Sequence, residues 1–449
     1  MIKMKRIYIL LLSALTLGAT SCNYLDVTPP GKVIPTKVSE YRALMTSAYQ
    51  AYPKFKHLLS VRSDEVFPLK DKEQAYDYYL DIATWNDVNP NTQTTSFPWE
   101  SVYKVIFYAN TVIDGVMNAE VDNREDPREQ IMAEALLMRA FAHFELLNLY
   151  GKPYNAATAA TDKGIPLATR IDIEQTYVPA TVEKTYEQIL EDLNEGSRLM
   201  QVEEQTTNRR YRFSKKAAKA LEARIRLYRS EWELALSAAE EILPSCTLED
   251  FNNTSFTNPW QIDSKESIMA MERVTLDIAN MMFILPGLLN KYEQGKDLRF
   301  NMFENTGTYY RTDKANGDNM KVTFRSAEIY LIAAEAAAHI NGKLEEAKER
   351  LLELMKNRLT PEYYTTKAAE VNAMNQQALI AEIADERARE LALEGHRWYD
   401  LKRTTRPEIV KKYNDRNGNT QRAILTQDDP RYTIRFPREA IENNPNLNN

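Results

Sequence analysis

Glycine and cysteine are scarce in this sequence. Only 13 of the 449 residues are glycine, whereas about 7% is average usage. Chains built from many tight β-turns need more glycine, so the composition favours helix. There are two cysteines, Cys22 and Cys246, which is too few for a disulfide framework. We predict that Cys246 is a small buried apolar residue.

Motifs that mark common enzyme sites are also missing. The sequence has no H-E-x-x-H, no E-x-x-H, no G-x-S-x-G, no phosphate loop and no G-x-G-x-x-G. Three of its four histidines lie in helical patterns, where packed or surface histidines are common. Two acids for glycoside hydrolysis remain possible, because carboxylates distant in sequence can meet in space. The 64 acidic residues do not single out a pair.

The N-terminus has the pattern of an export signal. Basic Lys3, Lys5 and Arg6 precede the apolar run 7–17, which is too short to span a bilayer comfortably. Small residues then lead to Cys22, the position at which a bacterial lipoprotein is cut and acylated. The usual lipobox has leucine three positions before the cysteine, where this chain has Ala19. We predict a lipoprotein signal at 1–21; an ordinary signal peptide is the alternative.

The predicted mature chain is acidic. Removing 1–21 removes three of 57 positive charges and no acid, so the net charge becomes 54 − 64 = −10. This charge opposes binding to nucleic acid or to an anionic membrane surface. No other stretch is a convincing membrane span. Residues 22–36, with three prolines and a glycine, are predicted to be the lipidated cysteine and a flexible tether.

Helical patterns dominate the rest, which we predict to be one mainly α domain at 37–449. Amphipathic periodicity predicts helices at 38–52, 98–117, 127–151, 182–200, 214–243 and 324–358. The fifth is expected to begin at an N-cap Ser214 and to break near Ser230, and the sixth to turn at Asn341–Gly342. Alanine-rich helical pairs of this length are typical of tetratricopeptide-like repeats. Simple packed hairpins are the alternative.

Two long regions, 60–97 and 244–323, lack helical periodicity. Such connections are usually functional or carry short strands. Aromatic rings on loops suit sugar faces and peptide side chains alike, while polar neighbours supply hydrogen bonds. The candidate ligand residues in these regions are Asp64, Tyr76, Tyr78, Tyr79, Trp85, Asn86, Asn91, Trp260, Tyr292, Tyr309 and Tyr310. For each aromatic residue, a local packing role is the alternative.

The stretch ERARELALEGHRWYDLKR, 386–403, most resembles an active site. Read as one helix, it stacks Glu386, Glu390 and Glu394 on one face. Arginines are interleaved with these acids, which suggests ion pairing rather than a metal site. We predict that Glu390 and Arg397 form structural ion pairs or hydrogen bonds.

Six stretches together resemble the SusD/RagB family of nutrient-binding outer-membrane lipoproteins from Bacteroidetes. They are CNYLDVTPPG (22–31), PWESVYKVIFYANTVI (98–113), AEALLMRAFAHFELLNLYGKPY (133–154), RSAEIYLIAAEAA (325–337), ERARELALEGHRWYDLKR (386–403) and IRFPREAIENNPNLNN (434–449). The 386–403 stretch is the most specific match. Trp99 belongs to a shared helix motif, so we expect it to be structural.

The resemblance implies a tetratricopeptide-like helical scaffold whose inserted loops bind oligosaccharides, or peptides in some branches. It implies a surface-exposed protein of the outer membrane that caps a SusC-like TonB-dependent transporter, without enzyme activity or cofactor. The family's ligand residues lie in variable loops, so none is carried over to this sequence. The rival hypotheses are oligopeptide capture, a lipid-anchored glycoside hydrolase, and a scaffold that binds a protein partner.

Overall fold

The computed structural model describes residues 35–122, 126–172, 177–274, 280–312, 314, 320–415 and 417–448. The predicted signal peptide 1–21, the predicted lipid anchor Cys22 and most of the tether 22–36 lie outside the described residues. Within the described part, no helix is long and apolar enough to cross a membrane.

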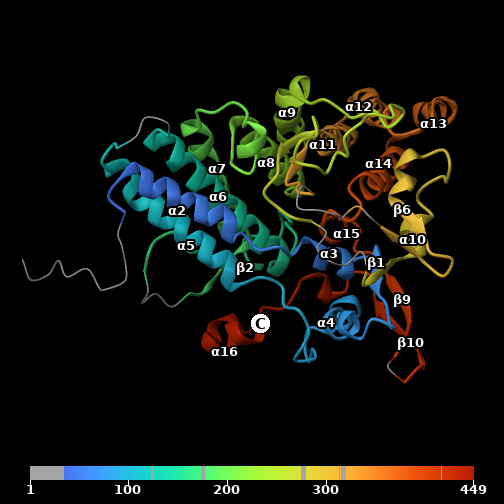
Figure 1. The fold of residues 1–449 in the computed structure, drawn as a ribbon, viewed down its shortest axis with the longest axis horizontal. Coiled ribbons are helices and arrows are strands. Elements are labelled where there is room, and N and C mark those ends of the chain that lie inside the picture. The colour runs from blue at the N-terminus through green and yellow to red at the C-terminus, as the bar shows by residue number, and fades with distance from the viewer. Residues whose placement is uncertain are drawn as a thin grey trace, which may run out of the picture.

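Helices make up most of the molecule (Figure 1). They are α2 (Val38–Ala51), α3 (Lys56–Arg62), α4 (Glu73–Ala83), α5 (Glu100–Gly115), α6 (Arg128–Tyr150), α7 (Val182–Leu199), α8 (Lys215–Tyr228), α9 (Trp232–Ile242), α10 (Pro286–Leu289), α11 (Ser326–His339), α12 (Leu344–Lys356), α13 (Pro361–Ala373), α14 (Gln376–Glu390), α15 (Arg397–Arg403) and α16 (Arg438–Asn443).

Short strands form five two-stranded antiparallel sheets between the helices. The pairs are β1 (Val66–Pro68) with β5 (Met282–Ile284), β2 (Lys163–Pro166) with β3 (Pro179–Thr181), β4 (Ser267–Met269) with β8 (Phe324–Arg325), β6 (Phe303–Asn305) with β7 (Tyr310–Thr312), and β9 (Ile409–Asn414) with β10 (Thr420–Leu425). Four of these ten strands lie in 244–323, which confirms that this region carries short strands.

The predicted helical hairpins are confirmed, and with them the tetratricopeptide-like scaffold. Helices α8 and α9 pack together, and so do α11 and α12. The Ser214 hydroxyl accepts a hydrogen bond from the Ala217 N–H at the start of α8. Ser230 has φ 58° where the first hairpin turns, and Gly342 has φ 81° where the second turns. Helix α11 is buried along nearly its whole length against α9, α12 and α14, which its many alanines permit.

The prediction that 60–97 is non-helical is wrong at α4. This helix buries Ala75, Tyr76, Tyr79, Ile82 and Ala83, and their spacing follows the helical period. Tyr76 and Tyr79 are therefore core residues of an amphipathic helix rather than loop aromatics.

The prediction of one continuous helix at 386–403 is also wrong. Helix α14 ends at Glu390 and α15 begins at Arg397. Leu393 has φ 65° and Gly395 has φ 80° between them. A Cβ on Gly395 would lie 2.9 Å from Lys56 side-chain carbons and 3.1 Å from its carbonyl oxygen. The chain therefore turns where α3 approaches closely, and glycine is required there.

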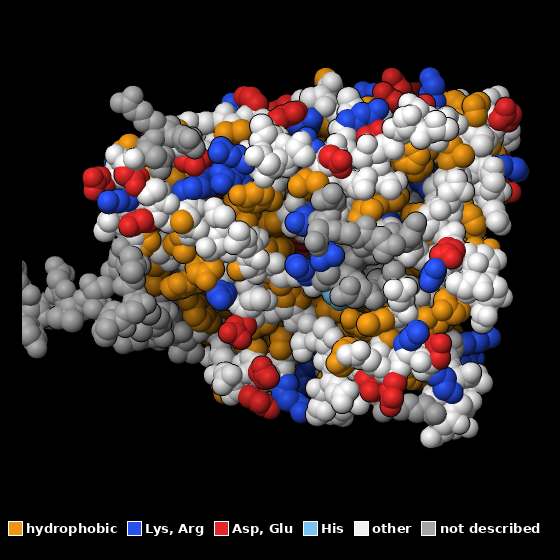
Figure 2. Space-filling view, viewed as in Figure 1, with side chains coloured by type: hydrophobic (Ala, Val, Ile, Leu, Met, Phe, Trp, Pro, Cys, Tyr) orange, Lys and Arg blue, Asp and Glu red, His pale blue; other side chains and the backbone are white. Residues whose placement is uncertain are grey.

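One hydrophobic core extends from α2 to the C-terminal residues, and includes both Val38 and Leu447. Cys246 lies in this core with a free thiol, as predicted. The C-terminal segment is held by the Ile434 N–H, which donates to the Leu149 carbonyl at 3.1 Å. On the face shown in Figure 2, basic and acidic side chains are interspersed over the helices.

Candidate ligand-binding cavity

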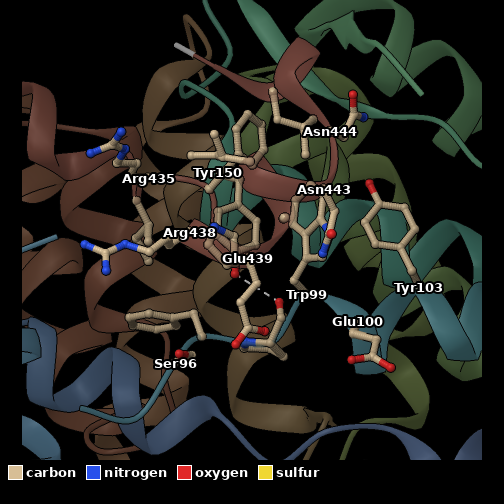
Figure 3. Close-up of a pocket in the computed structure, with 18 of the residues that line it drawn as sticks. Ser96, Trp99, Glu100, Tyr103, Tyr150, Arg435, Arg438, Glu439, Asn443 and Asn444 are labelled. Carbon is tan, nitrogen blue, oxygen red and sulfur yellow. Dashed lines mark hydrogen bonds between the residues drawn. The ribbon is translucent and has the colours of Figure 1, made fainter. Parts of the chain in front are cut away.

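A cavity of about 1370 Å³ lies where segments from both halves of the chain meet. It is lined by the loop between α4 and α5, the first turns of α5, the chain that follows β2, and the C-terminal segment 434–447. Figure 3 shows Trp99 near its centre, with Glu100 and Tyr103 on one side and Arg435 and Arg438 on the other. A cavity of this size can hold an oligomeric ligand.

Aromatic rings form the apolar part of the lining. The ring of Trp99 lies 4.9 Å from that of Tyr103, 5.2 Å from that of Tyr150 and 5.1 Å from that of Phe436, measured between centroids. Tyr150 and Phe436 stack at 5.6 Å. Phe436 and Tyr150 are buried, whereas Trp99 and Tyr103 are half-buried. The indole is thus fixed on one side by other rings and remains partly open to the cavity.

The two tyrosine hydroxyls hold this wall in place. Tyr150 donates to the Pro98 carbonyl at 3.0 Å, and Tyr103 donates to the Pro166 carbonyl at 2.8 Å. Burial raises the pKa of both phenols well above the usual value, so both stay protonated. Each bond joins the region around the start of α5 to a different element, which fixes the rings before any ligand arrives.

Amide and hydroxyl groups form the polar rim. The Asp81 carboxylate accepts hydrogen bonds from the Asn86 side chain (2.9 Å), the Asn91 backbone N–H (2.6 Å) and the Thr94 hydroxyl (2.7 Å). These bonds fold the loop after α4 into a fixed rim. In the C-terminal segment, the Asn444 side chain donates to the Tyr177 carbonyl at 2.6 Å. Asn86, Asn91 and Asn444 all line the cavity.

Five of the predicted ligand residues are buried elsewhere, and the structure does not support them as ligand platforms. They are Tyr76, Tyr79, Trp85, Trp260 and Tyr292. Trp85 is 1% exposed; its Nε1 donates to the Arg62 carbonyl at 2.9 Å, and its ring lies 4.9 Å from the Lys411 ammonium. Trp260 is 6% exposed and has the Lys314 ammonium 4.4 Å from its ring.

The remaining candidates divide between the cavity and other places. Asn86 and Asn91 line the cavity as described. Asp64 instead accepts two 2.8 Å bonds from the Arg397 guanidinium. Burial alone would raise the pKa of Asp64, but the bonds and charge of Arg397 outweigh it and the pKa is lowered. Tyr78 is half-buried on α4. Tyr309 and Tyr310 are half-buried at β7, outside the cavity lining.

The acids of 386–403 are structural, as predicted. Glu390 accepts bonds from three arginines: Arg325 (2.6 Å), Arg358 (2.9 Å) and Arg299 (2.8 Å). Burial opposes ionisation of Glu390, but these guanidiniums hold its pKa well below the usual value. The arginines come from 244–323, the start of α11 and the end of α12, so the cluster ties three parts of the chain to α14. Within the described residues, no His, Cys, Asp and Glu group is arranged to hold a metal ion.

The main site residues that the sequence did not reveal are Trp99, Phe436 and their neighbours in 434–447. We expected Trp99 to be structural because it lies in a shared helix motif, and it does pack on the core. It also lines the cavity. Trp99 is the N-cap of α5, next to the irregular loop 84–98. That position is the one feature of the sequence that could have indicated a ligand-binding role.

Comparison with known proteins gives consistent matches. A family model described as starch-binding, associating with the outer membrane, matches residues 23–227, and a SusD family model matches 288–448. A SusD-like protein of Formosa agariphila is 23% identical over 418 residues, covering 76% of this chain and 78% of that protein. A SusD superfamily structure from Bacteroides fragilis has a TM-score of 0.75 at 21% identity, and the match covers 93% of this chain and 100% of that one. A laminarin-binding SusD-like protein has a TM-score of 0.63 at 20% identity, and the match covers 82% and 92% of the two chains.

Proposed function

This chain belongs to the SusD/RagB family, and from that premise we propose that it captures oligosaccharides in the cavity around Trp99. One observation carries the proposal: a half-buried indole, backed by other rings, faces a cavity whose rim is rich in amides and hydroxyls. The C–H face of a sugar packs on such a ring, while its hydroxyls bond to the polar rim.

The proposed setting is the cell surface. Cys22 is the proposed lipid anchor, and residues 22–36 are the proposed tether. A SusC-like TonB-dependent transporter is the proposed partner that receives the oligosaccharide. Binding and release, rather than bond cleavage, are the proposed activity, and no cofactor takes part. The laminarin-binding relative supports a glycan as the ligand class.

Calorimetry with purified protein tests the ligand class. We expect binding to members of an oligosaccharide panel and none to a panel of oligopeptides. Binding to peptides alone would replace glycan capture with peptide capture. Glu100 and Glu439 are carboxylates in the same cavity, so the bound glycans are also assayed for newly released reducing ends. Sustained release would show an enzyme and overturn the proposal of capture without cleavage.

Co-purification tests the partner. An affinity-tagged chain, expressed in its own host with its native leader, should retain a TonB-dependent transporter from detergent-solubilised outer membranes. Cys22→Ser should release the chain from the membrane fraction. Recovery of the Cys22→Ser chain in the membrane fraction at the wild-type level would contradict the lipid anchor.

A further inference from the structure

In the part of the chain that the structure describes, arginine is nearly always paired. Among the arginines that the structure describes, all but three have a side-chain hydrogen bond, an ion pair or another interaction. The three exceptions are Arg422, Arg435 and Arg438. Arg422 lies on β10, whereas Arg435 and Arg438 line the cavity. The unpaired guanidiniums are therefore concentrated at the proposed ligand site.

The backbone fixes both cavity arginines on the exposed side of the C-terminal segment. Ile434 and Phe436 are buried, at 4% and 3% exposure. Arg435 is exposed between these two buried residues, so its side chain projects outward. Pro437 then caps α16, and Arg438 is its first residue. In Figure 3 the two guanidinium groups point to the same side, away from Glu100 and Tyr103.

The acidic residues that line the cavity restrict where a bound ligand can carry negative charge. Asp87 is paired with Arg62 at 2.6 Å, and Asp172 with Arg170 at 2.9 Å. Glu100, Glu439 and Glu442 also line the cavity, and no interaction of their carboxylates is seen within the described residues. A ligand with negative charge along its whole length would meet these carboxylates. A ligand with a single anionic group near the arginines would instead present neutral hydroxyls to Glu100.

We propose that the ligand of this cavity is an acidic oligosaccharide whose carboxylate or sulfate group is bound by Arg435 and Arg438. The inference rests on the proposed function, since it names the charge of the ligand at the same site. Planar guanidinium groups match the geometry of carboxylate and sulfate oxygens and form strong charge-assisted hydrogen bonds. Solvated surface arginines are the ordinary alternative, and Arg422 supplies an internal example of them.

The first test compares matched ligands. Calorimetry is run with uronate-containing and sulfated oligosaccharides, each beside its own carboxyl-reduced or desulfated form. We expect an acidic form to bind about 10- to 100-fold more tightly than its neutral counterpart. The advantage should shrink as NaCl is raised, because the guanidiniums are exposed and salt screens them. The uronate and sulfate series show which anionic group is recognised.

The second test uses variants. Arg435→Gln with Arg438→Gln should lower affinity for the acidic ligand by about 10- to 100-fold, so that the acidic form loses its advantage over the neutral form. Arg422→Gln is the matched control and should leave both affinities unchanged. The exposure of all three side chains makes loss of folding a minor concern, and thermal unfolding checks it.

The outcomes separate the inference from the proposed function. The inference alone would be overturned by either of two results. One is that neutral forms bind as tightly as acidic ones. The other is that the double variant keeps its affinity for the acidic ligand. Failure of every glycan to bind would overturn the proposed function, and the inference with it.

Discussion

Trp99 and Phe436 lie with ring centroids 5.1 Å apart and ring planes at 74°. Trp99 is the N-cap of α5, and Phe436 belongs to the C-terminal segment 434–447. An edge-to-face contact between two rings contributes stabilising energy in addition to that from the apolar area it buries. It also means that the cavity wall is complete only when the C-terminal segment is docked on α5 and the end of α6.

Replacing Trp99 with alanine should weaken oligosaccharide binding by about 10-fold or more, because a partly open ring at the centre of a site is a typical hot spot. Calorimetry measures the loss. Trp232→Ala is the matched control. Trp232 lies on α9, is also half-buried, and is not part of the cavity lining. Its ring stacks on that of His339, with centroids 4.0 Å apart. Equal losses in the two variants would show that the effect of Trp99→Ala is not local.

Trp85→Ala should act on folding instead of binding. Its ring is 1% exposed, and truncation of a buried tryptophan costs about 3–5 kcal/mol of unfolding free energy. Urea titration measures this cost, and calorimetry at a temperature where the variant is folded measures affinity. We expect wild-type affinity in the folded variant. Loss of binding with little loss of stability would restore Trp85 as a ligand platform.

The helical scaffold could be predicted from the sequence because its signals are local. Ser214 caps α8 through its own hydroxyl, Gly342 supplies the turn after α11, and the many alanines of α11 suit a closely packed helix. The break between α14 and α15 could not be predicted in this way. It depends on the approach of Lys56 to Gly395, and Lys56 lies on α3, far away in the sequence.

The cavity could be predicted only in part, for the same reason. Polar residues in a long loop are natural ligand candidates, and Asn86 and Asn91, which the sequence predicts on this ground, both line the cavity. The same reasoning favours Trp85, which is instead buried in the core. Whether a loop aromatic faces solvent or the core depends on tertiary contacts. Phe436 becomes part of the wall only because the C-terminal segment docks on α6, where the Ile434 N–H donates to the Leu149 carbonyl.

Glu390→Gln should destabilise the protein strongly and leave binding in the folded protein intact. The change removes the negative charge that three buried arginines share. Breaking a buried ion pair by removing one partner costs about 3–5 kcal/mol. Urea titration measures the cost, with Glu195→Gln as control, since the Glu195–Arg198 pair is exposed and such pairs contribute about 0–1 kcal/mol. Intact folding with abolished binding would assign Glu390 to the ligand site.

The buried carboxyl group of Glu65 should make the unfolding free energy depend on pH. Its buried carboxylate accepts a bond from the Leu393 N–H at 2.7 Å, in the turn between α14 and α15. Burial raises the pKa of Glu65 from 4.5 to about 7, since the backbone hydrogen bond offsets the burial only in part. Between these two pKa values the folded protein keeps a proton that the unfolded chain releases. This group therefore makes the unfolding free energy fall as pH rises from about 4.5 to about 7.

Glu65→Gln should remove that contribution, because glutamine still accepts the Leu393 bond and has no proton to lose. Urea titrations at pH 5, 6 and 7 should show the unfolding free energy of the variant falling less steeply than that of the wild type. The difference in slope should be at most about 1.4 kcal/mol per pH unit. Glu195→Gln, on an exposed helix face, should not flatten the profile. Equal slopes for wild type and Glu65→Gln would show that the Glu65 carboxyl is already ionised in the folded protein across this window.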